Sequence, residues 1–134
     1  MKILITLILL TISPSLFGSD DLSGKKIACY KEVDDNIFLL GFYFSDSSKA
    51  YVYTESNIIP MGKRWMTYET SISIINFYTN NGSNLKFTVN RRTLEIKDQN
   101  KKTAYLENDC KVISESIKSF FEEKLSKYKK QNKI

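Results

Sequence analysis

The 134-residue chain contains no histidine, the side chain that most often serves as a general base or binds a transition metal. Ser-His and Cys-His nucleophile pairs are excluded for the same reason. Three adjacent carboxylate pairs remain, Asp20-Asp21, Asp34-Asp35 and Glu122-Glu123. They fall at a terminus, in a turn and on a helix face, whereas catalytic carboxylates need a cleft that shifts their pKa values. We therefore expect solvated surface groups and no enzyme, and we expect no metal or cofactor because neither a phosphate loop nor a calcium loop is present.

Two cysteines, Cys29 and Cys110, are the only thiols. In a small exported domain such a pair is typical of a disulfide, and two buried free thiols are the alternative. A bridge closing a loop of about 80 residues would stabilise the fold by roughly 4 kcal/mol in the chain-entropy model. We therefore predict a disulfide between Cys29 and Cys110.

Aromatic side chains are unusually frequent on the segments that alternate like strands. They could line a pocket inside a small barrel, which would suit one apolar or planar ligand. The alternative is a solid core with tyrosines at the sheet surface, because barrels of this size are either filled or just able to hold one ligand. The connection 55–63 is apolar for a loop and could fold over an opening. The candidate ligand-binding residues are Phe42, Phe44, Tyr51, Tyr53, Trp65, Ile59 and Met61.

Basic residues form two short clusters, Lys63-Arg64-Trp65 and Arg91-Arg92, which could bind an anionic ligand or nucleic acid. The net charge is only +5 and no extended basic stripe is visible, so we do not expect nucleic-acid binding. The lysine-rich end at 124–133 could associate with an anionic membrane. We favour the simpler interpretation that these lysines complement the negative end of a helix.

Strands must position these side chains. The stretch 85–97 is the clearest, because Leu85, Phe87 and Val89 alternate with polar residues, Asn90-Arg91-Arg92 predicts a turn, and the alternation resumes at Leu94. Such a hairpin is marginal alone and implies a larger sheet. The other predicted strands are 24–31, 37–44, 49–54, 64–70, 72–79 and 103–107.

The last segment changes period. Apolar residues recur every three to four positions, which predicts an amphipathic helix over about 113–130 with Ser114 as its N-cap. The fold class is therefore mainly β, an antiparallel meander of about eight short strands that forms a small barrel or a strongly curved sheet, followed by one C-terminal helix.

The first 18 residues are typical of an export signal, with Lys2 before an apolar run and Gly18 and Ser19 at its end. A run of about ten apolar residues is too short for a membrane span, which needs about twenty. We expect cleavage after Gly18 or Ser19, a single domain over 19–134, and a periplasmic or secreted location.

Three fragments, Gly24-Lys25-Lys26-Ile27-Ala28-Cys29, Gly41-Phe42-Tyr43-Phe44 and the stretch 90–96, resemble small exported bacterial proteins with a lipocalin-like or related small-barrel plan. The resemblance implies a β-barrel fold and brings no activity. True lipocalins carry Gly-x-Trp near the first strand, whereas here Lys25 and Lys26 follow Gly24. No ligand-binding residue is carried over.

The leading hypothesis is an exported, non-enzymatic binding module that holds a small apolar or aromatic ligand. The alternative is a structural or interaction protein of the cell envelope, whose partner would be another envelope protein.

Overall fold

The computed structural model describes residues 22–79, 82–99 and 109–131. Within them, eight strands form one antiparallel sheet in the order β7-β6-β5-β4-β3-β2-β1-β8. The elements are β1 (Lys26–Val33), β2 (Asn36–Phe44), β3 (Lys49–Ser56), β4 (Gly62–Thr70), β5 (Ile74–Thr79), β6 (Asn84–Asn90), β7 (Ile96–Asp98), β8 (Cys110–Ile113) and α2 (Ile117–Gln131).

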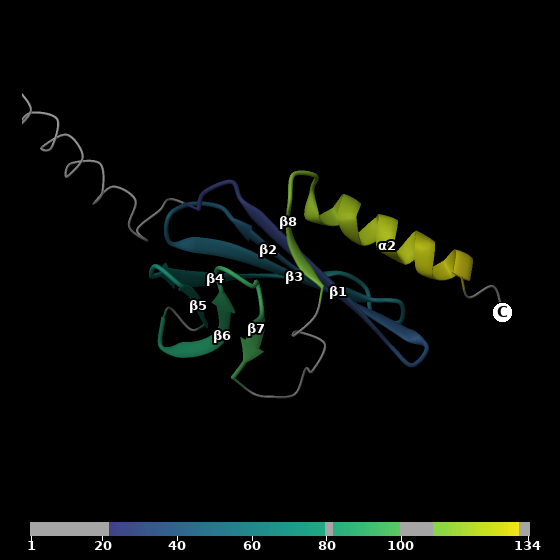
Figure 1. The fold of residues 1–134 in the computed structure, drawn as a ribbon, viewed down its shortest axis with the longest axis horizontal. Coiled ribbons are helices and arrows are strands. Elements are labelled where there is room, and N and C mark those ends of the chain that lie inside the picture. Colours follow the sequence, from purple (N-terminus) through teal and green to yellow (C-terminus); the bar gives the residue numbers. More distant parts are fainter. Residues whose placement is uncertain (1–21, 80–81, 100–108, 132–134) are drawn as a thin grey trace, which may run out of the picture.

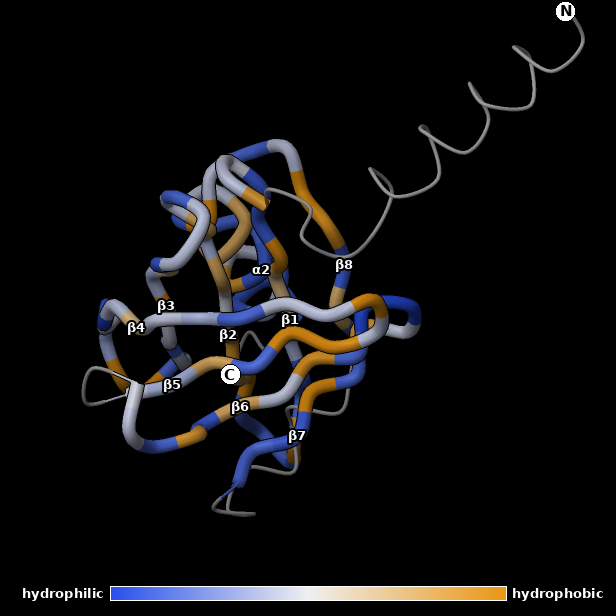
Figure 2. Tube along the Cα trace, turned by 90° about the vertical axis from the view of Figure 1, so that its left-hand side faces the viewer, coloured by the Kyte–Doolittle hydropathy of each residue, from blue (hydrophilic) through white to orange (hydrophobic). Residues whose placement is uncertain are grey.

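The sheet curls strongly into a half-barrel, and α2 lies along the outside of β1 and β2 (Figure 1). Viewed from the side, the strands wrap around an interior in which hydrophobic segments face one another (Figure 2). β7 and β8 are the two ends of the strand order, and within the described residues they do not pair with each other. The predicted fold class is confirmed, and the sheet is an open half-barrel compatible with a small-barrel plan.

Local turn chemistry places the strands in register. Asp34, at φ 56°, supplies the left-handed residue between β1 and β2. The Asp46 carboxylate accepts hydrogen bonds from the backbone N–H groups of Ser48 (2.8 Å) and Lys49 (2.7 Å), which closes the turn between β2 and β3. These contacts hold the Asp46 pKa below its ordinary value, with the Ser48 backbone bond the largest cause. Across these turns Cys29 pairs with Leu40, and Phe42 pairs with Val52.

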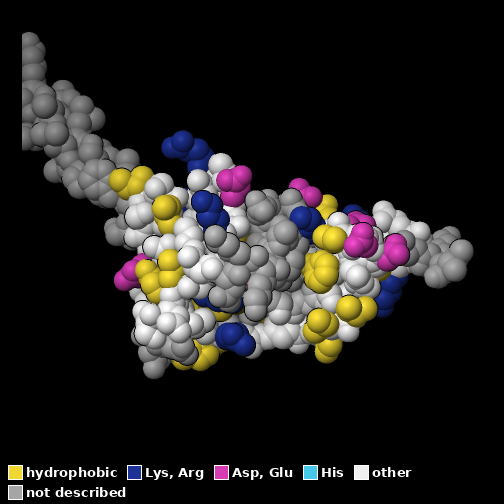
Figure 3. All heavy atoms as spheres, turned by 90° about the horizontal axis from the view of Figure 1, so that it is seen from below, with side chains coloured by type: hydrophobic (Ala, Val, Ile, Leu, Met, Phe, Trp, Pro, Cys, Tyr) yellow, Lys and Arg dark blue, Asp and Glu magenta, His cyan; other side chains and the backbone are white. Residues whose placement is uncertain are grey.

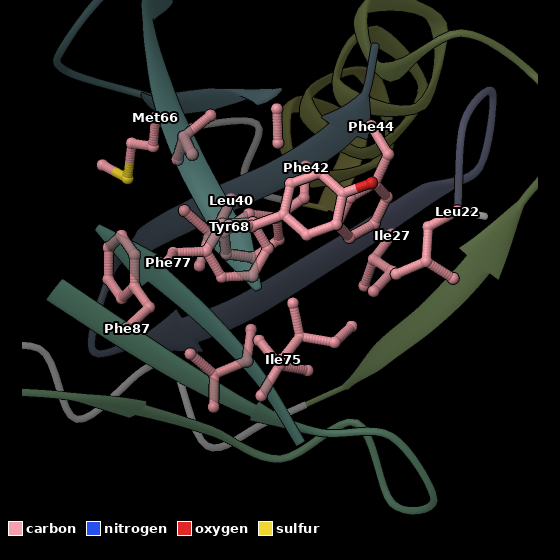
Figure 4. Close-up of a cluster of buried hydrophobic side chains, with 14 of the residues drawn as sticks. Leu22, Ile27, Leu40, Phe42, Phe44, Met66, Tyr68, Ile75, Phe77 and Phe87 are labelled. Carbon is pink, nitrogen blue, oxygen red and sulfur yellow. The ribbon is translucent and has the colours of Figure 1, made fainter. Parts of the chain in front are cut away.

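The inner face of the half-barrel, the concave side, is filled mainly by aromatic rings. Phe42 and Phe77 lie 4.6 Å apart between ring centroids, and Phe44 and Tyr68 lie 4.9 Å apart (Figure 4). The Tyr68 hydroxyl donates to the backbone carbonyl of Asp46 at 2.6 Å, so its polar atom is satisfied at the edge of the cluster. The centre of the half-barrel is therefore a packed core.

The outer face carries a second apolar cluster, in which α2 packs on β1 and β2. Ile117 and Phe121 of α2 are buried with Ala28 and Leu39 of the sheet. Gly41 permits this approach, because a Cβ at that position would lie 2.6 Å from Cγ2 of Ile117. The sheet is thus covered by apolar packing on both faces in its β1–β2 region.

The predicted disulfide is confirmed. Cys29 on β1 and Cys110 on β8 are directly opposite each other, with their Cα atoms 4.0 Å apart. The bridge joins the strand before α2 to the first strand of the domain. A disulfide is consistent with an oxidising, exported location.

The structure corrects the predicted start of the helix. α2 begins at Ile117, and Ser116 is the cap: its hydroxyl accepts from the N–H of Ser119 at 3.0 Å. Ser114 precedes the helix, and Ile113 belongs to β8. The apolar period continues through Ile113 because that residue is buried as the end of an edge strand, which periodicity alone does not distinguish from a helical turn.

Several strand boundaries also differ from the prediction, and turn contacts explain two of them. Leu94 lies in the turn at φ 63°, and the Asn90 side chain caps that turn by accepting from the N–H groups of Arg92 and Thr93. β5 begins at Ile74, because Ser71 closes a short loop by donating to and accepting from Ile74. The predicted strand 103–107 lies outside the described residues.

Candidate functional site

A pocket of about 360 Å³ opens on the inner face, at one side of the aromatic core. Residues of β2, β3, β4, β6 and β7 line it, so it spans the width of the half-barrel. We call it the mouth pocket. Its lining residues are Leu40, Val52, Thr54, Gly62, Lys63, Arg64, Met66, Lys86, Phe87 and Asp98.

The floor of the mouth pocket is apolar. Leu40, Val52, Met66 and Phe87 are all buried and belong to the inner core. In Figure 4, Met66 and Phe87 lie at one side of the ring cluster, whereas Leu22 lies at the other. The floor is therefore the edge of the aromatic core on the side of the pocket.

A glycine keeps the pocket open at its rim. Gly62 on β4 pairs with Thr54 on β3, and a Cβ at position 62 would lie 3.6 Å from Oγ1 of Thr54. Because Gly62 has no side chain, the space opposite Thr54 remains unfilled. Both residues are exposed, so this part of the rim faces solvent.

The charged side chains of the pocket differ in their partners. Lys86 forms an ion pair with Asp98 at 3.8 Å. The Lys63 ammonium lies 4.3 Å from the ring centroid of Tyr51, which places it against the outer-face aromatics. Arg64 lines the pocket, and no ion pair to it is present among the described residues. Arg64 is thus the cation most available to a ligand at the rim.

Phe42 and Phe44, two of the predicted ligand-binding residues, are 0% and 1% exposed in the aromatic core. Neither lines the mouth pocket. Their rings contact Phe77 and Tyr68 instead of an open space, because the interior of the half-barrel is narrow enough for side chains to fill its centre.

Tyr51, Tyr53 and Trp65 lie on the outer face. Tyr51 pairs with Trp65 across β3 and β4, and Trp65 is 49% exposed with the Lys49 ammonium 5.3 Å from its ring centroid. Tyr53 is half-buried and packs against the α2 cluster. The structure brings these three together, but on the opposite side of the sheet from Phe42 and Phe44.

The remaining predicted residues, Ile59 and Met61, are exposed in the loop between β3 and β4 and do not line the pocket. Ser56 closes this loop, because its hydroxyl accepts from the backbone N–H groups of Ile58 (3.2 Å) and Ile59 (2.9 Å). Asn57 ties the loop to β2 by accepting from the N–H of Ile37 at 2.9 Å. The loop is a hydrogen-bonded turn with outward apolar side chains.

Sequence reasoning missed the residues that form the floor and the cation at the rim. Leu40, Val52 and Met66 alternate like ordinary core residues, and nothing in that pattern marks the boundary of a pocket. The strand register was the missing information, because it sets Arg64 opposite Val52 on the inner face. Gly62 is the one local signal of an opening, but its position opposite Thr54 also follows from the register.

The face of the molecule in Figure 3 carries no single basic stripe. Lysine, arginine and acidic side chains are interspersed there with hydrophobic ones. Arg91 supports a turn, because it donates to the carbonyl of Ser71 at 2.7 Å. The described ranges contain no cluster of three or more metal-binding side chains. The part of the chain described here also lacks a helix long and apolar enough to span a membrane.

Comparisons with models of protein families, with curated proteins and with solved structures found no match to this chain. The function is therefore inferred from the fold and the mouth pocket.

Proposed function

We propose that the protein is a non-enzymatic binding module that holds one small, largely apolar molecule in the mouth pocket. The observation that supports this is a pocket of about 360 Å³ whose floor consists of four buried apolar side chains. That volume lies at the small end of the range of ligand sites, about 300–1,000 Å³. In this proposal the ligand lies at the edge of the inner core and not under the β3–β4 loop that contains Ile59.

An uncharged apolar fluorophore, N-phenyl-1-naphthylamine, tests this proposal. We expect its emission to rise on addition of the oxidised protein, with saturation at one site. Thr54→Phe places a ring opposite Gly62 and should abolish the rise by filling the rim. Val112→Phe adds a ring at an exposed position on β8, away from the pocket, and is the matched control.

Circular dichroism and thermal unfolding of both variants establish that they keep the fold. Failure of the wild-type protein to bind the fluorophore would refute the pocket as a ligand site. Undiminished binding by a folded Thr54→Phe variant would place the probe elsewhere and would equally contradict the proposal.

A structural or interaction role in the cell envelope is the second candidate, supported by the loop between β3 and β4. Ile58 and Ile59 are 68% and 59% exposed although the loop is held by hydrogen bonds, so their exposure is built into the turn. Ile58→Ser/Ile59→Ser would abolish binding to an envelope partner while leaving fluorophore binding unchanged. Loss of fluorophore binding in that variant would instead assign the loop to the pocket.

A further inference from the structure

The mouth pocket is polarised from its floor to its rim. Leu40, Val52 and Met66 at the floor are buried, whereas Thr54 and Arg64 at the rim are exposed. A ligand that satisfies both regions needs an apolar part for the floor and a polar part at the rim, because an apolar group left at the rim would remain in water.

The charged side chains around the pocket also determine which charge the polar part of the ligand should carry. Asp98 is the one acidic side chain among the described pocket residues, and Lys86 neutralises it at 3.8 Å. Lys63 is engaged with the tyrosines of the outer face at 4.3 Å and 5.8 Å. The Arg64 guanidinium remains, with donors that match the geometry of a carboxylate, sulfate or phosphate.

Strand geometry places Arg64 next to the apolar floor. Arg64 pairs with Val52 across β3 and β4, and it lies two residues before Met66 on the same face of β4. The Arg64 side chain therefore leaves the inner face beside two floor residues, Val52 and Met66. One ligand molecule can contact the floor and the guanidinium at the same time.

We propose that the ligand is a single-tailed amphiphile with one anionic head group, which lays its tail on the apolar floor and its head group against Arg64. This inference rests on the proposed function of the mouth pocket and adds the chemical class of its ligand. The small volume suits a short tail.

Competition against N-phenyl-1-naphthylamine with three ten-carbon compounds tests the inference. Decanoate, decanol and decylamine share one tail and differ in head-group charge. At low salt and neutral pH we expect decanoate to displace the fluorophore at about tenfold lower concentration than decanol, with decylamine weakest. Raising the salt to about 0.5 M should shrink the difference, because the rim is exposed to screening.

Arg64→Gln is the decisive variant. It should reduce the affinity for decanoate to that for decanol and leave decanol itself unchanged. Arg92→Gln removes the same charge from an exposed turn residue that does not line the pocket, and it should leave the ratio of the two affinities intact. Folding of both variants is verified by circular dichroism.

Equal displacement by decanoate and decanol, or a preference for decanoate that survives Arg64→Gln, would overturn the inference while fluorophore binding still supported the pocket. Equal weakening of all three compounds by Arg64→Gln would also overturn it, since Arg64 would then contact the tail. Failure of the fluorophore itself to bind would instead refute the proposed function, and this inference with it.

Discussion

Three consecutive residues, Lys63, Arg64 and Trp65, have three different environments. Lys63 and Trp65 lie on the outer face among aromatic rings, and Arg64 lines the mouth pocket on the inner face. The cause is the two-residue period of a strand, which sends neighbouring side chains to opposite faces. A basic cluster in the sequence is therefore divided by the sheet: Lys63 and Arg64 both line the mouth pocket, but only Arg64 projects from the inner face.

The position of Glu55 in the fold changes the pKa of its carboxyl group. It lies on β3 near α2, where partial burial first and the neighbouring Glu122 carboxylate second raise its pKa, against an opposing effect of Lys129. A raised pKa in the folded state means that folding favours the protonated form. Stability from this group is present below its ordinary pKa of 4.5 and is lost as the pH rises through the folded-state value.

We therefore expect Glu55→Gln to raise the free energy of unfolding at pH 7, because it removes an unfavourably placed charge. The gain should shrink as the pH falls below about 4.5, where wild-type Glu55 is protonated in both states. Urea unfolding at pH 7 and pH 3.5 measures the difference. Glu123→Gln, on the exposed side of α2, is the control, and a gain that is equal at both pH values would contradict the prediction.

At the scale of elements, α2 docks on the sheet through a place where the sheet has no side chain. Gly41 lies beneath Ile117, so the helix approaches β2 more closely than any larger residue would allow. Lys124 adds a contact to β1, with its ammonium 4.2 Å from the ring centroid of Tyr30. The helix is held by close packing of Ile117 on Gly41 at its N-terminal end and by the Lys124–Tyr30 cation–π contact further along.

Gly41→Ala should lower the free energy of unfolding by about 1–3 kcal/mol through overpacking against Ile117. Ile117→Ala removes both nearby atoms, so Gly41→Ala should cost far less in that background, and a double-mutant cycle from denaturant unfolding measures the coupling. Gly62→Ala, whose Cβ would have only an ordinary contact at 3.6 Å, is the control. Equal costs of Gly41→Ala in both backgrounds would show that the contact is not the cause.

The helix start allows a matched pair of substitutions. Ser116→Ala removes the hydroxyl that accepts from Ser119 N–H and should cost about 1 kcal/mol. Ser114→Ala changes an exposed residue before the helix and should cost little. Thermal unfolding of the two variants compares them directly. The reverse order of costs would restore Ser114 as the cap.

At the scale of the whole molecule, one curled sheet serves two apolar clusters. The inner cluster extends from Ile27 on β1 to Ile96 on β7, and the outer cluster joins β1 and β2 to α2. β1 contributes to both, through Cys29 on the inner face and Ala28 on the outer face. The disulfide acts at this same strand, so it links the first strand, the edge strand β8 and the helix that follows.

Cys29→Ser/Cys110→Ser should therefore destabilise the whole domain. The bridge spans 81 residues of sequence, for which the chain-entropy model predicts a loss of about 4 kcal/mol in the free energy of unfolding. Denaturant unfolding of the variant and of the wild-type protein with and without reductant measures this. The reduced wild-type protein should match the variant, and an unchanged midpoint after reduction would contradict the prediction.

Much of the fold was predictable because its signals are local. The alternation in 85–90 and the apolar run in 37–44 mark strands regardless of their partners, and the amphipathic period marks the helix. The boundaries of the elements were less predictable. Leu94 fits the alternation of a strand and Ile113 fits the period of the helix, although neither residue belongs to that element. Leu94 lies in a left-handed turn that Asn90 caps, whereas Ile113 ends an edge strand whose partner, Lys26, is far away in the sequence.

By itself, the sequence determined the strand rhythm, the absence of histidine chemistry and the presence of an amphipathic helix, since each depends on residue types and short-range spacing, and it indicated the disulfide because the chain has just two cysteines. Only the tertiary structure decided which aromatic residues are core and where a pocket remains. Curvature and register bring Val52, Met66 and Phe87 from three strands to one floor and set Arg64 beside it. The physical reason is that a cavity is what side-chain packing leaves unfilled, and packing is set by contacts between residues far apart in the chain.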